Sequence, residues 1–463
     1  MRLFKIKNIN RYLFSLISLI SMVSFMYPDI IITAGHSYYI YSKGNFYKNA
    51  LDALIYKNNH IPAVYELPIY IIFAIWNLPL RIISLLIGKD VFGFYASNST
   101  NSSLLFKLLW AKLFVILFLV LSAYVIYKIC LELGMSNRKS KNTLFMFLFS
   151  IYTFFPVLIH SQYDIIPLFF MLMGIFYFMK NKIILFIVYF SIALVMKTYA
   201  IFIFIPLLLL YEKNIKKIFM NILLVSSLLV ILKLYLKGDY YYHISQKDFT
   251  IGMMNRLFTS NIISSNGHIS IFIIILFFIC CFSYLKVLEK DEMKILSIYI
   301  PLIVFMGFFS FVPYNLQWII LLSPFISIMI SINYTKTNKI LEALLSLSAF
   351  MTIILYCNKI ILFIDSYYLP KIYRANGVQK FQSIYQIVEG IFKNSVILGH
   401  VPDLLSTIFV GSSIVFLILN FPQKKWSINN IEKTEITEKD NLIRLSIPTI
   451  LVVLFLFCYY YSG

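Results

Sequence analysis

The stretch Leu113–Tyr127 reads LFVILFLVLSAYVIY, and it decides the fold class of this chain. Two other stretches are equally apolar, Ile183–Met196 (IILFIVYFSIALVM) and Ile271–Phe282 (IFIIILFFICCF). Each sits in a window long enough, or nearly so, to cross about 30 Å of hydrocarbon as a helix. Backbone polar groups in lipid must be satisfied within the segment, and the alternating pattern of a membrane barrel is absent from the sequence. The sequence therefore predicts an all-α, polytopic bundle of transmembrane helices.

Composition supports the same class. The chain has 463 residues, of which 60% are hydrophobic and 13% charged, and its mean hydropathy is +0.83. A soluble domain of this length cannot hide so much apolar surface, because most surface positions must face water. The net charge of +20 comes from short Lys and Arg clusters between apolar runs, where they orient membrane segments, so an anionic partner such as nucleic acid is disfavoured. The cysteines lie in or beside apolar runs and form neither a disulfide framework nor a metal-type spacing: Cys130, Cys280, Cys281, Cys357 and Cys458.

The segment pattern predicts about 12–13 membrane spans. Residues Met1–Met26 resemble a signal peptide, but no small-residue cleavage site follows, so we expect an uncleaved first helix with a cytoplasmic N-terminus. The spans are expected at about 10–27, 104–128, 143–159, 164–180, 183–197, 199–212, 218–236, 270–286, 295–312, 318–334, 340–363, 402–421 and 443–461. Several are short, so the pairs 143–180 and 183–212 are candidates for hairpins that cross only part of the bilayer.

The apolar stretch Leu67–Gly88 decides the topology. If it spans the membrane, the cluster Arg138–Lys141 falls outside; if it is a re-entrant or juxtamembrane helix, every later basic loop lies inside. We therefore expect a long first external loop, 28–103, that carries juxtamembrane helices. The other external segments are then 237–270, 312–317 and 365–401, while 423–441 is a cytoplasmic loop.

The chain is expected to be a single integral-membrane domain, 1–463, without an internal repeat or a soluble catalytic domain. Any chemistry must then use the external loops or the outer ends of helices. The frequent use of Ile, Lys, Asn and Tyr is typical of an AT-rich genome and favours a bacterial plasma membrane.

Asp29 lies where the first helix leaves the membrane. Partial desolvation there should raise the pKa of its carboxyl, which suits a general base that takes a proton from a hydroxyl. The alternative is a carboxylate that only marks a helix end. His36 follows seven residues later and shares a helical face with Asp29 if the segment is helical, although a lone interfacial His is commonly structural.

Two further polar clusters interrupt the apolar runs. His160, Gln162 and Asp164 fall at the outer end of a hairpin, with His160 and Asp164 on one face if helical; they either bind substrate or cap two helices. Lys197 is a lone cation in an apolar run, which either pairs with a phosphate or extends its ammonium to the interface. Arg256, beyond an aromatic and basic loop, is a second candidate phosphate ligand.

Several short motifs in residues 1–212 resemble the GT-C superfamily of integral-membrane glycosyltransferases, which take sugars from polyprenyl phosphates. His160–Asp164 (HSQYD) is similar to the His-x-Gln-Tyr-Asn stretch of the glucosyltransferases of N-glycan assembly. The other pieces are the Asp after the first helix and the stretches Gly44–Tyr47, Ile69–Pro79, Trp110–Leu113 and Ala193–Lys197 followed by Pro206. Residues 213–463 match only as a more variable half of apolar helices.

The resemblance implies an inverting transfer of a sugar from a polyprenyl-phosphate donor to a glycan, lipid-linked or wall-polymer acceptor at the outer face. Asp29 would be the general base, and His36, His160, Gln162, Asp164, Lys197 and Arg256 would bind substrate. The first loop lacks the family's Asp-x-Asp or Asp-Glu pair, so no cofactor is predicted and a divalent metal is unsupported. The rival functions are a flippase or transporter of lipid-linked glycans, for which a repeat is expected, and a polysaccharide polymerase, for which 365–401 would be the large loop.

Overall fold

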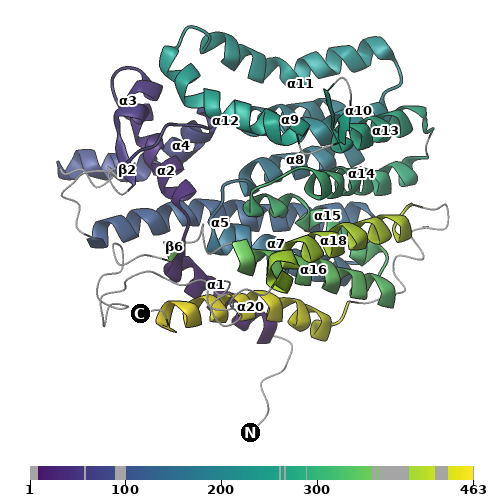
Figure 1. Ribbon diagram of the computed structural model, residues 1–463. Helices are drawn as coiled ribbons and strands as arrows, with labels where there is room; N and C mark the ends of the chain where they lie inside the picture. Colours follow the sequence, from purple (N-terminus) through teal and green to yellow (C-terminus); the bar gives the residue numbers. More distant parts are fainter. Residues whose placement is uncertain are drawn as a thin grey trace.

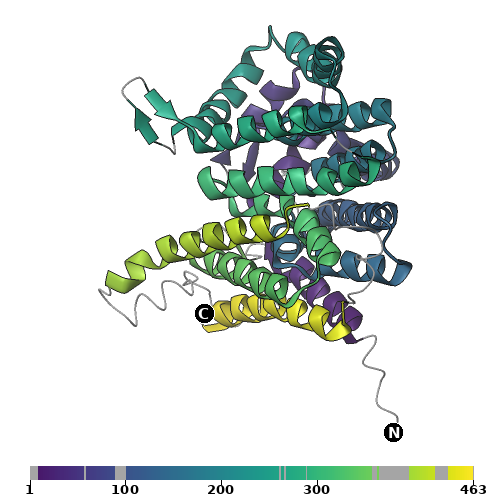
Figure 2. The same cartoon turned by 90° about the vertical axis from the view of Figure 1, so that its right-hand side faces the viewer.

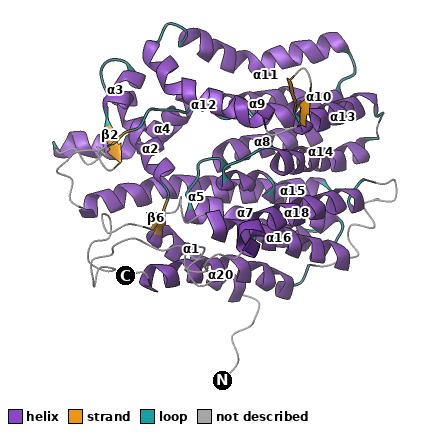
Figure 3. Ribbon diagram, viewed as in Figure 1, coloured by secondary structure: helices purple, strands orange, loops and turns teal. Residues whose placement is uncertain are grey.

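The computed structural model describes residues 9–56, 59–88, 101–259, 262–264, 267–287, 289–356, 362–363, 396–422 and 436–461. These residues are almost entirely helical, and the strands form three two-stranded antiparallel pairs (Figure 3). The pairs are β1 (Phe25–Met26) with β6 (Leu362–Phe363), β2 (Leu54–Tyr56) with β3 (Asn59–His60), and β4 (Ile262–Ser264) with β5 (Gly267–Ile269). The predicted all-α helical bundle is confirmed.

The first half of the chain starts with one apolar helix and then builds a cluster of shorter elements before the longest helix. These elements are α1 (Ile9–Ser24), α2 (Pro28–His36), the 3-10 helix η2 (Ser37–Tyr41), α3 (Phe46–Asp52), α4 (Leu67–Ile87) and α5 (Asn101–Glu132). Next come α6 (Asn137–Phe149), α7 (Ile151–Phe154), the π-helical turn η3 (Phe155–Ile159), α8 (Ile165–Met179), α9 (Ile183–Met196) and α10 (Ala200–Tyr211).

The second half continues with α11 (Ile215–Tyr235), α12 (Tyr240–Thr259), α13 (Ile271–Leu285), α14 (Lys290–Phe311) and the 3-10 turn η4 (Leu316–Leu321). It ends with α15 (Ser323–Ile332), α16 (Lys336–Tyr356), α18 (Val396–Leu419) and α20 (Glu438–Tyr461). Most long helices lie side by side in a stack, with α2, α3 and α4 gathered at one end (Figure 1). In the turned view the β4–β5 hairpin projects from one side of this stack (Figure 2).

Seven of the described helices are long and apolar enough to cross a membrane, and the bent pair formed by α6 and 151–159 makes eight. The least buried of these helices is α11: 11% of the residues in its most apolar stretch are buried, against 78% in α14. Its exposed side chains include Phe219, Leu223 and Ile231, which could not face water over a whole helix. The chain is therefore a multi-pass membrane protein, with α11 on the outside of the bundle and α14 in its core.

Six shorter apolar helices account for the other predicted spans. At 1.5 Å per residue, the 15-residue α8 is only about 22 Å long, short of the roughly 30 Å hydrocarbon layer. The count of 12–13 spans and the direction of the bundle in the membrane stay predictions. So does the topology of Leu67–Gly88: it forms one continuous helix, α4, in spite of Pro79, and its length fits either a crossing or a juxtamembrane helix.

Several predicted boundaries were wrong. The span 143–159 is broken at Ser150, whose extended backbone lets its hydroxyl cap α7, and the two parts bend by 57°. The span 318–334 starts with η4, and 340–363 ends at Tyr356, after which Leu362–Phe363 pairs with the chain leaving α1. The expected loop 237–270 contains the 20-residue helix α12. Most of 365–401 and 423–441 lies outside the described residues.

Candidate active site

Five separate segments meet at the end of the bundle that carries α2 and α4. They are the start of α2, the segment before α4, the turn 160–164, the end of α9, and η4 with its preceding residues. Each lies at the start or the end of a helix. Backbone groups at a helix end are not all bonded within the helix, so the chain can turn there and direct polar side chains inward. Pro28 opens α2 at its first turn, which fixes Asp29 at the helix start.

Asp29 is half-buried, and the hydroxyl of Tyr65 donates a hydrogen bond to its Oδ2 at 3.3 Å. Desolvation raises the pKa of the carboxyl from 3.8 to about 6. The nearby Lys197 ammonium and hydrogen bonds from Tyr65 and Gln162 pull this pKa down, while the charge of Asp164 pushes it up. Burial also raises the pKa of Tyr65 far above neutrality, so its hydroxyl keeps the proton it donates. The upward shift expected for Asp29 is present.

A buried ion pair lies beside Asp29. Lys197 Nζ is 2.9 Å from Oδ1 of Asp164, whose side chain is fully buried while that of Lys197 is 10% exposed. Asp164 also accepts hydrogen bonds from Gln162 Nε2 at 3.1 Å and from the Tyr199 hydroxyl at 3.2 Å. A buried carboxylate requires such partners, because it would otherwise be strongly destabilising.

The backbone explains why these side chains converge. Ser161 has a φ of 56°, in the left-handed region, so residues 160–164 form a turn and not the helix that would place His160 and Asp164 on one face. The shared face expected for a helical segment therefore does not form. Lys197 ends α9 in an extended conformation, which directs its side chain out of the helix axis and toward the turn.

Three aromatic rings surround the Lys197 ammonium. Its Nζ lies 4.9 Å from the ring centre of Tyr65, 4.7 Å from that of Tyr163 and 5.8 Å from that of Trp318. Aromatic faces attract cations and exclude water, so the rings keep the ammonium in place at the inner wall of the site.

Arg256 approaches the same tryptophan from α12. Its guanidinium carbon lies 5.8 Å from the Trp318 ring centre, and Nη1 donates to Asn315 Oδ1 at 3.0 Å. Trp318 thus contacts both Lys197 and Arg256, which are 59 positions apart in the sequence. The two cations proposed from sequence to bind a phosphate share one aromatic wall.

His160 lies next to this group but does not join its hydrogen bonds. Its ring stacks on Tyr27 with 4.5 Å between centres and an angle of 3°. Burial lowers the pKa of His160 to about 3, so the ring is neutral. Within the described parts of the chain, neither ring nitrogen of His160 nor Oε1 of Gln162 has a hydrogen-bond partner. Unpaired buried polar atoms at a site fit a place where substrate or water completes the bonding.

His36 is placed away from the ion pair. It is fully buried and packs edge-on against Tyr70 at 5.8 Å, beside the backbone of 61–62. Burial lowers its pKa to about 3. Tyr70 connects His36 to the site, because its hydroxyl accepts a hydrogen bond from the backbone N–H of Tyr65.

The structure therefore brings together Asp29, Gln162, Asp164 and Lys197. Arg256 and His160 lie at the edge of this group, and His36 packs outside it.

Sequence reasoning missed the aromatic side chains of the site: Tyr27, Tyr65, Tyr163, Tyr199 and Trp318. Tyr163 lies between two residues that were singled out, and Tyr27 lies two positions before Asp29, so that signal was available. Tyr65, Tyr199 and Trp318 carry no local pattern that separates them from the other tyrosines and tryptophans of the chain.

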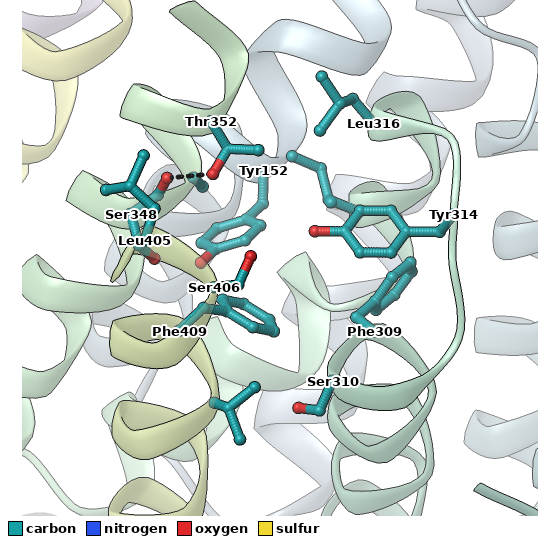
Figure 4. A pocket seen from close by; sticks show the side chains of 13 residues that line it. Tyr152, Phe309, Ser310, Tyr314, Leu316, Ser348, Thr352, Leu405, Ser406 and Phe409 are labelled. Atoms are coloured by element: carbon teal, nitrogen blue, oxygen red, sulfur yellow. Dashed lines mark hydrogen bonds between the residues drawn. The ribbon is translucent and has the colours of Figure 1, made fainter. Parts of the chain in front are cut away.

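A separate cavity of about 100 Å³ lies beside η4 (Figure 4). In a 3-10 helix residues three apart share a face, so Leu316 and Ile319 line this cavity while Asn315 and Trp318 face the cations. Figure 4 shows the hydroxyl groups of Tyr314 and Ser406 pointing toward the middle of the space. One turn of 3-10 helix therefore separates the charged site from a mixed polar and apolar cavity.

Comparison with protein-family models and with curated proteins finds no match to this chain. The resemblance to the GT-C superfamily rests on the motifs quoted above. Among the described residues, no group of three or more His, Cys, Asp or Glu side chains lies close enough together to hold a metal ion.

Proposed function

We propose that this protein is a membrane glycosyltransferase of the GT-C type, which transfers a sugar from a polyprenyl-phosphate donor to a hydroxyl of a glycan or lipid-linked acceptor. The observation that carries the proposal is the half-buried Asp29 carboxyl, with its pKa raised to about 6, beside the Lys197–Asp164 pair. Positions as distant in the sequence as 29, 164 and 197 supply these groups.

In the proposed reaction, Asp29 accepts the proton of the acceptor hydroxyl as its oxygen attacks the anomeric carbon. The bond from that carbon to the phosphate oxygen breaks, and polyprenyl phosphate leaves with the electron pair, so the configuration inverts. A base with a pKa near 6 is mostly ionised at neutral pH yet still basic enough to take a proton late in the reaction. Tyr65 would favour the ionised carboxylate through its 3.3 Å hydrogen bond.

The cations would serve the leaving group. Lys197 is already 2.9 Å from Asp164, so part of its charge is offset before any donor binds. Arg256 donates to the Asn315 amide, and its guanidinium is a planar set of donors suited to phosphate. We therefore propose Arg256 as the direct phosphate ligand and Lys197 as a nearby positive charge that stabilises the developing negative charge.

The alternative is that the ion pair only fastens helices together in a transporter or flippase for lipid-linked glycans. A buried pair is weak evidence for either function, because structural pairs also occur. The half-buried Asp29 favours the enzyme, since a carboxyl that only braces the fold has no need of access. A polysaccharide polymerase would differ in the acceptor that it uses. The roles proposed for Asp29, Lys197 and Arg256 would stay the same.

The test is transfer by purified protein in detergent, with a labelled polyprenyl-phosphate sugar and a lipid extract of the cell envelope as acceptor. Asp29→Asn should reduce release of polyprenyl phosphate by about 10²–10⁴-fold while thermal melting stays at or above the wild-type value. The matched control is Asp52→Asn, which removes an exposed carboxyl from the same loop at the end of α3 and should leave transfer unchanged.

Full transfer by Asp29→Asn would exclude Asp29 as the base. Lipid movement in vesicles of the wild type, without release of polyprenyl phosphate from any donor, would instead establish the transporter.

A further inference from the structure

A second, open cavity of about 550 Å³ lies between the end of α11 and the first half of α12. The lysines Lys233, Lys237 and Lys247 line it, together with Tyr240, Ile244 and Ile251. The proposed transfer reaction does not use this cavity. Its lining combines cations with apolar side chains, an uncommon mixture for a surface that faces only water.

The charge of the cavity is positive. Lys233 is largely neutralised, since its Nζ is 2.5 Å from Oε1 of Glu66. The ammonium groups of Lys237 and Lys247 have no such acid partner within the described residues. Asp239, the nearest acid in the sequence to Lys237, caps α12: it accepts from the backbone N–H groups of Tyr241 and Tyr242 at 3.0 and 3.1 Å. In the part of the chain that the structure describes, no acidic side chain lines the cavity, so its wall carries the ammonium groups of Lys237 and Lys247 without an acid among them.

Several large apolar side chains are exposed along α12, among polar ones. Tyr240 is 68% exposed, Ile244 43% and Ile251 49%, and the same face continues through Met254 and Phe258. These positions recur at helical spacing, so they form one stripe along the helix. Lys247 falls within this stripe at the same helical spacing, so an ammonium group lies among the exposed apolar side chains.

The opposite face of α12 holds the candidate active site in place. Gln246 Nε2 donates to the backbone oxygen of Tyr65 at 3.0 Å, and Phe249 packs edge-on against the Tyr65 ring at 5.9 Å. Arg256 reaches Asn315 from the same face. The outer face of α12 is therefore free to meet lipid while its inner face is fixed to the bundle.

We propose that this cavity binds an anionic phospholipid of the surrounding membrane. Its phosphate would lie between Lys237 and Lys247, and its acyl chains would cover the stripe that begins with Ile244 and Ile251. Charge complementarity decides the class of lipid, because a wall with two ammonium groups and no acid favours a net negative headgroup over a zwitterionic one. The proposal stands apart from the transfer reaction and does not depend on it.

Native mass spectrometry of the detergent-purified full chain tests the proposal, with phosphatidylglycerol and phosphatidylcholine as competing probes. One basic residue near an anionic surface contributes about fivefold in affinity, so Lys237→Gln with Lys247→Gln should weaken phosphatidylglycerol binding about thirtyfold and leave phosphatidylcholine binding unchanged. The matched control is Lys216→Gln with Lys217→Gln, the same charge change on exposed lysines at the opposite end of α11. Gel filtration of both double variants confirms folding.

Preference for phosphatidylglycerol that survives in the 237/247 variant, or that falls equally in both variants, overturns the assignment. So does displacement of the lipid by millimolar inorganic phosphate, since a free anion would then suffice. Loss of preference in the 237/247 variant alone, with no effect of inorganic phosphate, establishes the lipid site whether or not the protein transfers sugars.

Discussion

Removal of the Tyr65 hydroxyl should shift the pH dependence of transfer without abolishing it. The hydroxyl donates to Asp29 at 3.3 Å and so favours the ionised carboxylate. A hydrogen bond to a charged group is worth about 1.5–3 kcal/mol, and this one is long, so the lower end applies. About 1.4 kcal/mol corresponds to one pKa unit. Tyr65→Phe should therefore raise the pKa of Asp29 from about 6 to about 7.

The direction of the pH effect follows from the role of Asp29 as a base, because a carboxyl must be ionised before it can accept a proton. Activity should be present above the pKa of Asp29 and be lost as the pH falls through about 6 in the wild type. At pH 6 the ionised fraction would drop from about a half to about a tenth, so the rate should fall about fivefold. At pH 9 both proteins are fully ionised, and their rates should agree within about twofold.

The assay is release of polyprenyl phosphate between pH 5 and pH 9. Phe at position 65 keeps the ring that packs on Lys197, so the change isolates the hydroxyl. Tyr235→Phe is the matched control, because Tyr235 is 79% exposed at the end of α11. An acid limb at the same pH in wild type and Tyr65→Phe, or a uniform loss of rate at every pH, would refute the assignment of that limb to Asp29.

Two further predictions concern stability, measured as thermal melting in detergent. Lys197→Met leaves the fully buried Asp164 carboxylate without its cation and should destabilise the fold by about 3–5 kcal/mol. Adding Asp164→Asn removes the unpaired charge and should restore most of this stability. A double variant that melts no higher than Lys197→Met would contradict coupling between the two residues. Lys112, buried in α5, donates to the carbonyl oxygens of Met22 and Phe25 where α1 ends. Lys112→Met should therefore cost about 1–3 kcal/mol through unsatisfied carbonyls, and unchanged melting would show that other donors replace the ammonium.

The helices were predictable because lipid imposes a simple rule on the sequence. A segment such as Leu113–Tyr127 has almost no polar side chain, and in hydrocarbon its backbone can satisfy itself only as a helix. The rule fails at helix ends, where backbone bonds are shared with side chains. Ser150 breaks a predicted span in this way, and the 237–270 segment hides α12 because its apolar stripe is too mixed with polar residues to stand out.

The site was predictable in its polar members and not in its aromatic ones. Asp29, Asp164 and Lys197 attract notice in a sequence that is only 13% charged, because a charge near a membrane segment requires a partner. Tyr65 and Trp318 give no such signal among 34 tyrosines and four tryptophans. His36 lies in the same helix as Asp29, as expected, but its ring packs against Tyr70, so its role in binding substrate stays a prediction.

Hydropathy alone is enough to place this chain in a membrane as helices and to show which few ionisable groups must be accommodated there. Which of these groups meet depends on the packing, because pairing requires helices to end and turn at the right residues. The left-handed backbone at Ser161 and the extended residue Lys197 bring Asp164 and its cation together across 33 positions of sequence. Hydropathy is a property of each segment, whereas a desolvated carboxyl such as Asp29 is a property of everything packed around it.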